Sequence, residues 1–249
     1  MQSEMYENLA ELEEQEYWWF RGRAKIAEYF FKRYFRLGTE KRILDVGCGM
    51  GGELEWLEKY GQVYATDIEP VAVEATKKRA HHPESIQIGA LPDKINFGVD
   101  FDAVVAMDVL EHVAEDEASL RFIKTSLLKS GGLLLLTVPV FGWLWSPHDE
   151  VHMHMRRYTR PELRHKLESA GFTIQKISYF NTFLFPLAVM VKIFSKIFRR
   201  TPKAHFNKPL PGFINQLFYY IFLLEKYCLS FINFPYGVSL VVVAKTDSK

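Results

Sequence analysis

The stretch from Ile43 to Gly52, which reads ILDVGCGMGG, decides the fold of this chain. The segment Arg42 to Val46 predicts a short apolar strand, and residues 53–60 beyond the glycines have helical spacing. Glycine permits a tight turn and lets a ligand approach the backbone closely. A strand, a glycine-rich turn and a helix in this order are typical of nucleotide-binding α/β folds, although a G-x-G-x-x-G pattern alone is not specific.

On both sides of this stretch, short apolar segments alternate with segments of helical spacing. Strands are predicted at residues 42–46, 63–66, 86–88, 101–107, 133–138, 172–178 and 238–244. Helices are predicted at residues 4–16, 26–35, 53–60, 70–80, 115–128 and 159–170. Strands separated by helices imply a parallel sheet with right-handed crossovers. The sequence therefore predicts an α/β fold, a Rossmann-like doubly wound sheet of seven strands.

Three parts of the chain are distinguished by their composition. Residues 1–38 predict an N-terminal helical lid, in which four consecutive aromatic residues from Tyr17 to Phe20 interrupt the helix. Residues 39–178 together with 238–249 predict the core. Residues 179–237 predict an apolar helical insert before the last strand.

The overall composition excludes several classes of protein. A chain of 249 residues with 48% hydrophobic residues can bury a large core. The formal net charge of +1 gives no general attraction to nucleic acid, so no nucleic-acid partner is expected. Cys48 and Cys228 make no disulfide framework, and the acidic N-terminus carries no secretory signal. We therefore expect a cytoplasmic protein, with peripheral contact to the inner face of the membrane.

Two aspartates at predicted strand ends discriminate between cofactors. Asp45 precedes Gly47, and Asp67 ends the next strand, where a carboxylate can accept hydrogen bonds from ribose hydroxyls. A dinucleotide places its pyrophosphate at this turn and would be repelled by Asp45, whereas the ammonium and sulfonium groups of S-adenosylmethionine are cationic. We therefore expect S-adenosylmethionine. A nicotinamide or flavin cofactor, and a turn without a ligand, are the alternatives.

Three motifs resemble those of class I S-adenosylmethionine-dependent methyltransferases, notably the ubiquinone-biosynthesis O-methyltransferases. They are ILDVGCG at 43–49, FDAVVAMDVLEHV at 101–113 and LLKSGG at 127–132. The last has Ser130 where the family has proline, and residues 129–132 are predicted as a turn. The similarity runs over residues 17–178. It implies a methyltransferase whose sheet ends in an antiparallel pair of strands.

The resemblance also implies which residues bind the cofactor. They are Asp45, Gly47 and Gly49 at the methionine part, Asp67 at the ribose, Ile68, Ala90 and Leu91 at the adenine, and Met107 and Asp108 by the methionine end. Gly89 stands where many relatives have an acidic residue, so a side-chain contact to the adenine amine is not implied. In ubiquinone-type relatives the positions of Asp108, Glu111 and His112 are associated with a divalent metal. A metal held by these three residues is one interpretation, but the expected one is that Glu111 and His112 cap and orient the loop, because the spacing permits metal ligands without being diagnostic of them.

A histidine-rich segment follows the fifth predicted strand, at the edge of the sheet where doubly wound folds bind ligands. Methyl transfer to a hydroxyl benefits from a general base, and a neutral histidine can accept a proton near neutral pH. His148 and His152 are the predicted bases. The predicted substrate contacts are Trp18, Trp19, His154, Arg156, Arg157 and Tyr158, and Arg21 is predicted to meet the cofactor carboxylate. Ordinary packing of the tryptophans, a solvated polar loop and a zinc site are the competing interpretations.

The insert contains two apolar stretches, 183–198 and 213–234, with Arg199, Arg200 and Lys203 between them. Neither stretch has the roughly 20 uninterrupted apolar residues that a transmembrane helix needs. Apolar faces with basic edges suit a helix that lies in the membrane interface, while a cap over the substrate and a dimer surface are alternatives.

These patterns together predict O-methylation of a lipid-like or lipid-linked small molecule, with peripheral membrane contact through residues 183–234. N- and C-methylation stay open. The competing functions are a nicotinamide-dependent oxidoreductase and a non-catalytic membrane-peripheral module that binds the cofactor without turnover.

Overall fold

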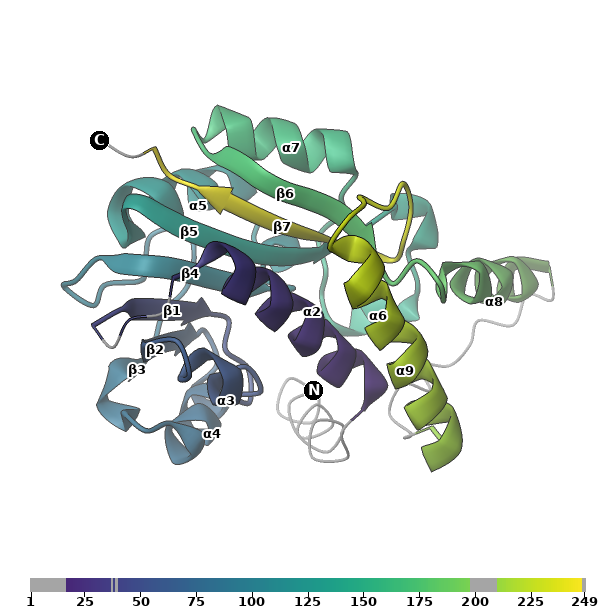
Figure 1. Ribbon diagram of the computed structural model, residues 1–249, viewed down its shortest axis with the longest axis horizontal. Coiled ribbons are helices and arrows are strands. Elements are labelled where there is room, and N and C mark those ends of the chain that lie inside the picture. Colours follow the sequence, from purple (N-terminus) through teal and green to yellow (C-terminus); the bar gives the residue numbers. More distant parts are fainter. Residues whose placement is uncertain (1–16, 37, 39, 198–209, 248–249) are drawn as a thin grey trace.

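The computed structural model describes residues 17–36, 38, 40–197 and 210–247. The helix predicted at 4–16 and the basic residues Arg199, Arg200 and Lys203 lie outside the described residues. Figure 1 shows one sheet with helices on both faces, and two helices, α8 (Phe185–Ile197) and α9 (Gly212–Leu229), gathered at one end.

The sheet confirms the predicted fold class. Its seven strands are β1 (Arg42–Val46), β2 (Gln62–Asp67), β3 (Ile86–Ile88), β4 (Phe101–Met107), β5 (Leu128–Pro139), β6 (Thr173–Phe180) and β7 (Ser239–Lys245). Their order is β3-β2-β1-β4-β5-β7-β6. β1 to β5 are parallel, whereas β7 runs antiparallel to both β5 and β6. The strand order reverses at β1 and β4, and in doubly wound sheets ligands bind beside the carboxyl ends of the strands at such a point.

The central strands are apolar because helices cover both of their faces. Every residue of β4 is buried except Asp102, and residues 240–244 of β7 are fully buried. Polar side chains are excluded from the middle of the sheet and gather where the strands end.

The remaining helices connect and cover these strands. They are α2 (Trp18–Tyr34), α3 (Leu54–Leu57), α4 (Pro70–Arg79), α5 (Asp116–Phe122), α6 (Pro147–Val151) and α7 (Arg160–Ser169). Single turns of 3₁₀ or π helix occur at Pro83–Ser85, Leu110–His112, Ile123–Leu127 and Gly142–Leu144. The predicted start of α7 is confirmed, because Thr159 and Glu162 form a capping box. Among the described residues, no helix combines the length and the apolar character needed to cross a bilayer.

Helix α2 packs on the sheet, with α9 alongside its N-terminal half (Figure 1). It begins at Trp18 rather than at the predicted Ile26, so Trp18, Trp19 and Phe20 belong to the helix and Tyr17 lies just before it. Trp19 stacks on Phe222 of α9 with ring centroids 5.5 Å apart, and the Trp18 N–H donates to Asn215 Oδ1 at 2.8 Å. The two helices approach so closely at Gly22 that a Cβ there would lie 2.0 Å from Phe222 Cδ1.

Three predicted boundaries are also wrong. The helix predicted at 115–128 ends in a π turn, and β5 begins at Leu128, so the predicted turn at 129–132 belongs to a bulged strand. The Gly132 N–H donates to Thr246 Oγ1 at 2.9 Å, which ties this irregular start to the chain after β7. β6 extends to Phe180, so two residues assigned to the insert belong to the sheet.

Candidate active site

A cavity of about 1470 Å³ lies at the carboxyl ends of β1, β2 and β4. Its floor is formed by the glycine turn and the strand ends. Its walls come from α2, from the histidine-rich segment that contains α6, and from one side of α8. The topology therefore brings parts of the chain that are far apart in sequence to one site.

The glycine turn and Asp67 support each other. Gly47 has a φ of +70°, which side chains rarely adopt, and a Cβ there would lie 2.5 Å from Val109 Cγ2. The Gly49 N–H donates to Asp67 Oδ2 at 2.9 Å, and the Glu69 N–H donates to Asp67 Oδ1 at 3.0 Å. These bonds fix the orientation of the Asp67 carboxylate at the cavity.

Asp45 lines the cavity from the end of β1 and is only 1% exposed. Burial, together with the charges of Asp45 and Asp67, raises the pKa of the neighbouring Cys48 thiol. Cys48 therefore stays protonated and is not a nucleophile. Two carboxylates beside one cavity suit a cationic ligand that also carries hydroxyl groups.

Arg23 of α2 joins two acidic residues at the cavity wall. Its guanidinium lies 2.5 Å from Asp108 Oδ2 and 2.9 Å from Glu53 Oε1. Asp108 has a φ of +56°, and its side chain also accepts a hydrogen bond from Thr137 Oγ1 at 2.9 Å. An aspartate held in this uncommon conformation by a charged partner and a buried hydroxyl is typical of a functional site.

The apolar side of the cofactor region matches the predicted residues. Ile68, Ala90, Leu91 and Met107 line the cavity. Ile68 is 63% exposed, although it is a large apolar residue, because it stands at the open edge of the cavity. A flat apolar ring placed there would cover it.

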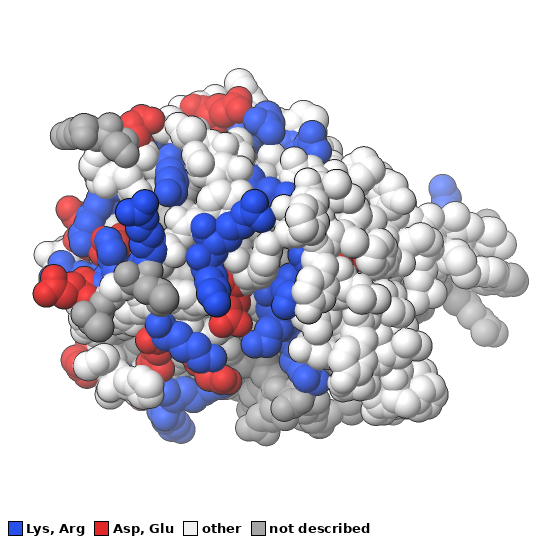
Figure 2. Space-filling model, in the orientation of Figure 1, with Lys and Arg blue, Asp and Glu red and all other residues white. Residues whose placement is uncertain are grey.

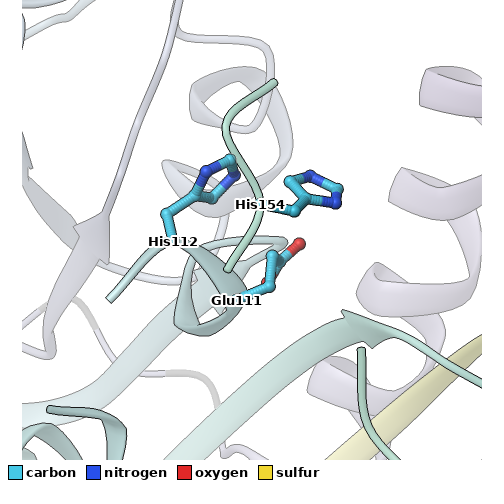
Figure 3. A group of neighbouring side chains, drawn as sticks. All are labelled: Glu111, His112 and His154. Atoms are coloured by element: carbon cyan, nitrogen blue, oxygen red, sulfur yellow. The ribbon is translucent and has the colours of Figure 1, made fainter. Parts of the chain in front are cut away.

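Three side chains from two separate segments surround one point of the cavity wall. Glu111 and His112 come from the turn after β4, and His154 comes from the segment after α6; Figure 3 shows them around one space. One ligand atom from each lies within 4.8 Å of the others. Glu111 is fully buried, and neither carboxylate oxygen has a hydrogen-bond partner among the described residues. Burial and the charge of Asp108 raise the pKa of Glu111 well above its ordinary value.

His154 is oriented by a buried carboxylate. Its Nδ1 lies 2.9 Å from Asp149 Oδ1, and Arg157 contacts both Asp149 oxygens at 2.7 and 2.9 Å. Burial opposes ionisation of Asp149, but the hydrogen bonds from His154 and Arg157 outweigh it and hold its pKa well below the ordinary value. The charged carboxylate favours a proton on Nδ1 of His154 and leaves Nε2 to accept another.

His148 and His152 line the same cavity with ring centroids 4.0 Å apart. Removal from bulk water and the neighbouring histidines lower the pKa of His148 to about 3 and that of His152 to about 4. Both rings are therefore neutral at pH 7, and both are weak bases.

The model of a methyltransferase domain family matches residues 14–177. The chain belongs to this family of methyltransferases. The methyltransferase is 39% identical over 103 residues to the ubiquinone biosynthesis O-methyltransferase of Xanthomonas axonopodis pv. citri, a match that covers 39% of this chain and 42% of that protein. It is 33% identical over 104 residues to the mitochondrial ubiquinone biosynthesis O-methyltransferase of Schizosaccharomyces pombe, covering 39% and 38%. These matches span about two-fifths of the length of the relatives.

Solved structures share the fold of the methyltransferase. Phosphoethanolamine N-methyltransferase 2 of Haemonchus contortus, solved with S-adenosylmethionine, has a TM-score of 0.56 at 16% identity, covering 88% of this chain and 51% of that one. An S-adenosylmethionine-dependent methyltransferase of Mesorhizobium loti has a TM-score of 0.56 at 15% identity, covering 87% and 95%.

Membership of the methyltransferase family sets the oxidoreductase alternative aside. S-adenosylmethionine is the cofactor that the sequence predicts. The residues present fit this cofactor. Asp45 would supply negative charge for its cationic part, the Asp67 carboxylate at the cavity would accept hydrogen bonds from its ribose, and a Cβ at Gly49, which also lines the cavity, would meet only open space.

Several predicted site residues lie elsewhere in the methyltransferase. Arg21 does not line the cavity; its guanidinium covers the Tyr219 ring of α9 at 4.0 Å. Tyr158 is fully buried and donates to Asp116 Oδ2 at 2.9 Å. Arg156 pairs with the same aspartate at 2.9 Å, so neither Tyr158 nor Arg156 faces a substrate.

Other predicted residues reach the cavity but have partners in the protein. Arg157 is engaged by Asp149. Trp18 and Trp19 line the cavity and also pack on α9, which agrees with the packing interpretation; their role as a lid stays a prediction. The acidic and histidine trio implied by the resemblance is rearranged, because Asp108 pairs with Arg23 and His154 joins Glu111 and His112 instead.

Sequence reasoning missed Arg23, Glu53 and Asp149 as site residues. A signal existed for Arg23, because it falls in the same helical stripe as the buried residues Ala27 and Phe30 of α2, whereas Arg21 does not. Asp149 follows His148 in sequence but is buried by the fold, and no pattern in the sequence indicates which histidine it contacts.

Proposed function

We propose that this methyltransferase O-methylates a lipid-like or lipid-linked small molecule. The observation that carries the proposal is the continuity of the cavity, which joins the cofactor residues at the strand ends to the buried histidine group and to an apolar wall formed by α8. The ubiquinone biosynthesis O-methyltransferases matched over part of the chain support an oxygen acceptor.

When bound, S-adenosylmethionine supplies a methyl group on a positively charged sulfur. An acceptor hydroxyl forms the new oxygen–carbon bond as the carbon–sulfur bond breaks, and its proton must leave. In the proposal His154 Nε2 receives that proton, because Asp149 holds Nδ1 at 2.9 Å and stabilises the charged ring. His148 and His152, predicted as bases, stay predictions; their low pKa values suit them better to accepting a hydrogen bond that orients the acceptor.

The apolar wall fits an acceptor with a hydrocarbon part. Leu184, just before α8, and Leu187, Ala188 and Val191 of α8 line the cavity, and Lys192, Ser195 and Lys196 line it further along the helix. An apolar group against this wall would exclude water from the reacting atoms, and aligning the reactants in a water-poor site supplies much of the rate of a methyl transfer.

Glu111, His112 and His154 would instead fit a divalent metal ion, an alternative to the role of His154 as a base because the metal would occupy the same Nε2. The buried Glu111 carboxylate lacks a hydrogen-bond partner among the described residues, and His154 has the carboxylate behind it that metal-binding histidines usually have. A metal there would act as a Lewis acid toward an acceptor oxygen. Calorimetric titration of chelator-treated protein with Zn²⁺ tests this. A metal site is supported if His112→Ala abolishes Zn²⁺ binding while His165→Ala, on the exposed face of α7, preserves it. If the wild type does not bind Zn²⁺, the metal site is excluded.

Radiolabelled methyl transfer tests the proposed function. The protein is incubated with methyl-labelled S-adenosylmethionine and a total membrane lipid extract in detergent. We expect label in the organic phase as a methyl ether, and its loss in Asp67→Ala. Label on nitrogen or carbon, or in water-soluble products, would contradict the proposal. No label, with cofactor binding intact, would favour a non-catalytic module.

A further inference from the structure

Helix α8 is apolar except for Lys192, Ser195 and Lys196, and none of its residues is buried. The side that carries these three polar residues, together with Leu187 and Val191, lines the cavity. Met190 and Phe194 do not line the cavity, and 51% and 54% of their surface is exposed. An apolar helix face is normally covered by the protein core or by another partner, and this one is covered by neither in the isolated chain.

Helix α9 adds a second exposed apolar stripe. Its inner side packs on α2, while its outer side presents residues spaced by three or four positions. They are Phe213, Leu217, Tyr220, Leu224 and Tyr227, with exposures of 76%, 54%, 56%, 58% and 62%. Phe231, just beyond the helix, continues the stripe and is 89% exposed.

The charges on these elements have one sign wherever they meet solvent. In the described parts of the insert, 181–197 and 210–237, the acidic residue is Glu225, and it is fully buried. The exposed Lys196 lies in the last turn of α8 and also lines the cavity, and the partly exposed Lys226 lies in the last turn of α9. Arg33 of α2 donates to the Ser230 carbonyl at 3.0 Å, which places a further cation next to Phe231. Figure 2 shows charged side chains over one half of this face and an almost uncharged surface over α8 and α9.

We propose that α8, α9 and Phe231 form a docking surface for an anionic lipid bilayer. The apolar stripes would enter the interfacial layer and the basic residues would meet the lipid headgroups, without any helix crossing the membrane. Because α8 separates this surface from the cavity, an acceptor held in the bilayer reaches the histidine group past α8. This route rests on the proposed function; the docking itself does not.

A second copy of the chain fits the surface less well. A two-fold contact through α8 and α9 would bring equal basic residues toward each other with no exposed acidic residue of the described insert to balance them. Closure of the insert over the cavity would cover the inner side of α8 but leave the outer stripe of α9 exposed. The bilayer is the occupant that satisfies both stripes and the basic edge.

Vesicle sedimentation of the full chain tests the docking surface. The protein is mixed with vesicles of phosphatidylcholine alone, or of phosphatidylcholine and phosphatidylglycerol in equal parts. We expect partitioning to be about tenfold stronger on the anionic vesicles, and to fall by about tenfold or more in the double variant Leu217→Asp/Leu224→Asp. Val71→Asp, near the N-terminus of α4, places a similar charge on an exposed apolar site far from the insert and should bind as the wild type does.

Titration with S-adenosylhomocysteine shows that each variant is folded. Protein that stays in the supernatant with both vesicles, or that binds them equally, overturns the proposal. So does a dimer, detected by size-exclusion chromatography, that the double variant dissociates while vesicles bind neither form. If label is transferred to lipid in detergent but the protein does not bind vesicles, only the docking surface is refuted. If the protein binds vesicles but transfers no label, only the proposed acceptor is refuted.

Discussion

On the cofactor side of the cavity, charged groups are buried and held by donors: Asp67 accepts two backbone N–H groups, and Asp108 contacts Arg23 at 2.5 Å. On the α8 side the reverse holds, because large apolar groups such as Met190 and Phe194 are more than half exposed. A buried charge is tolerated only where its partners are already in place, while an exposed apolar surface gains only when something covers it. The first region is therefore complete in the isolated chain, whereas the second presents the exposed surface that the proposed bilayer would cover.

The largest expected effect comes from His154, the proposed general base on the polar side of the cavity. His154→Ala should lower methyl transfer by about 10³-fold, because the acceptor proton loses its oriented base. Binding of S-adenosylhomocysteine should be unchanged, which separates turnover from folding. His165→Ala is the matched control on the surface of α7. Equal activity of His154→Ala and the control would remove His154 from the mechanism.

The second largest effect concerns Glu225 of α9, a buried acid in the apolar region. Burial raises the pKa of Glu225 from its ordinary 4.5 to about 7, although the Phe183 N–H donates to it at 2.5 Å. The native state thus holds the proton more tightly than the unfolded chain, so the stabilising contribution is complete below pH 4.5 and is lost as the pH rises through 7.

Relative to Glu225→Gln, the wild type should therefore lose up to about 3 kcal/mol of unfolding free energy as the pH rises from about 4.5 to 8. Urea unfolding at several pH values measures this. Glu168→Gln, on the exposed face of α7, should track the wild type. Parallel pH profiles for Glu225→Gln and the wild type would show that Glu225 does not titrate in this range.

The cofactor contact itself is the third test. Asp67→Ala should weaken S-adenosylhomocysteine binding by about 100-fold, because the two ribose hydroxyls of the ligand would lose the charged carboxylate that accepts their hydrogen bonds. Calorimetry measures the affinity. Asp100→Ala removes an exposed carboxylate before β4 and should bind normally. If Asp67→Ala binds as tightly as Asp100→Ala, the orientation of the Asp67 carboxylate has no role in cofactor binding.

The smallest expected effect concerns the contact between α2, which borders the cavity, and α9, which carries the exposed apolar stripe. Gly22→Val should destabilise the protein by about 2 kcal/mol, because a Cβ at this position meets Phe222 and forces α2 and α9 apart. Lys25→Val places the same side chain on the exposed face of α2 and should cost less. Thermal unfolding with both variants compares them; equal melting temperatures would mean that the two helices adjust without loss.

The sequence predicted the polar region far better than the apolar one. The glycine turn after β1 and the position of Asp67 at the end of β2 were predicted correctly, because they follow from the local path of the chain; their role in binding the cofactor stays a prediction. The choice of Arg21 over Arg23 failed because it ignored which face of α2 meets the sheet, although the stripe through Ala27 and Phe30 shows it. Local patterns are reliable where one segment makes the site.

Contacts between distant segments were out of reach. Tyr158 lies within a polar segment that looked exposed, yet the fold buries it against Asp116. Glu111 follows β4 and His154 follows the neighbouring strand β5, and no spacing in the sequence indicates that the two side chains meet. The sequence also could not distinguish a cap from a membrane surface in the insert, because both roles need the same composition and α8 presents both sides at once.

The insert leaves the sheet after β6 and returns to it at β7, its immediate neighbour. The Val238 N–H donates to the Phe180 carbonyl at 3.0 Å, so the two ends of the insert are closed by the same antiparallel pair that continues into the sheet. In topological terms this is a hairpin whose loop has grown into a helical module. Such a module can be exchanged during evolution, or grafted in the laboratory, with little demand on the strands that hold the cofactor. A family built this way can change the acceptors it reaches while it keeps one methyl donor.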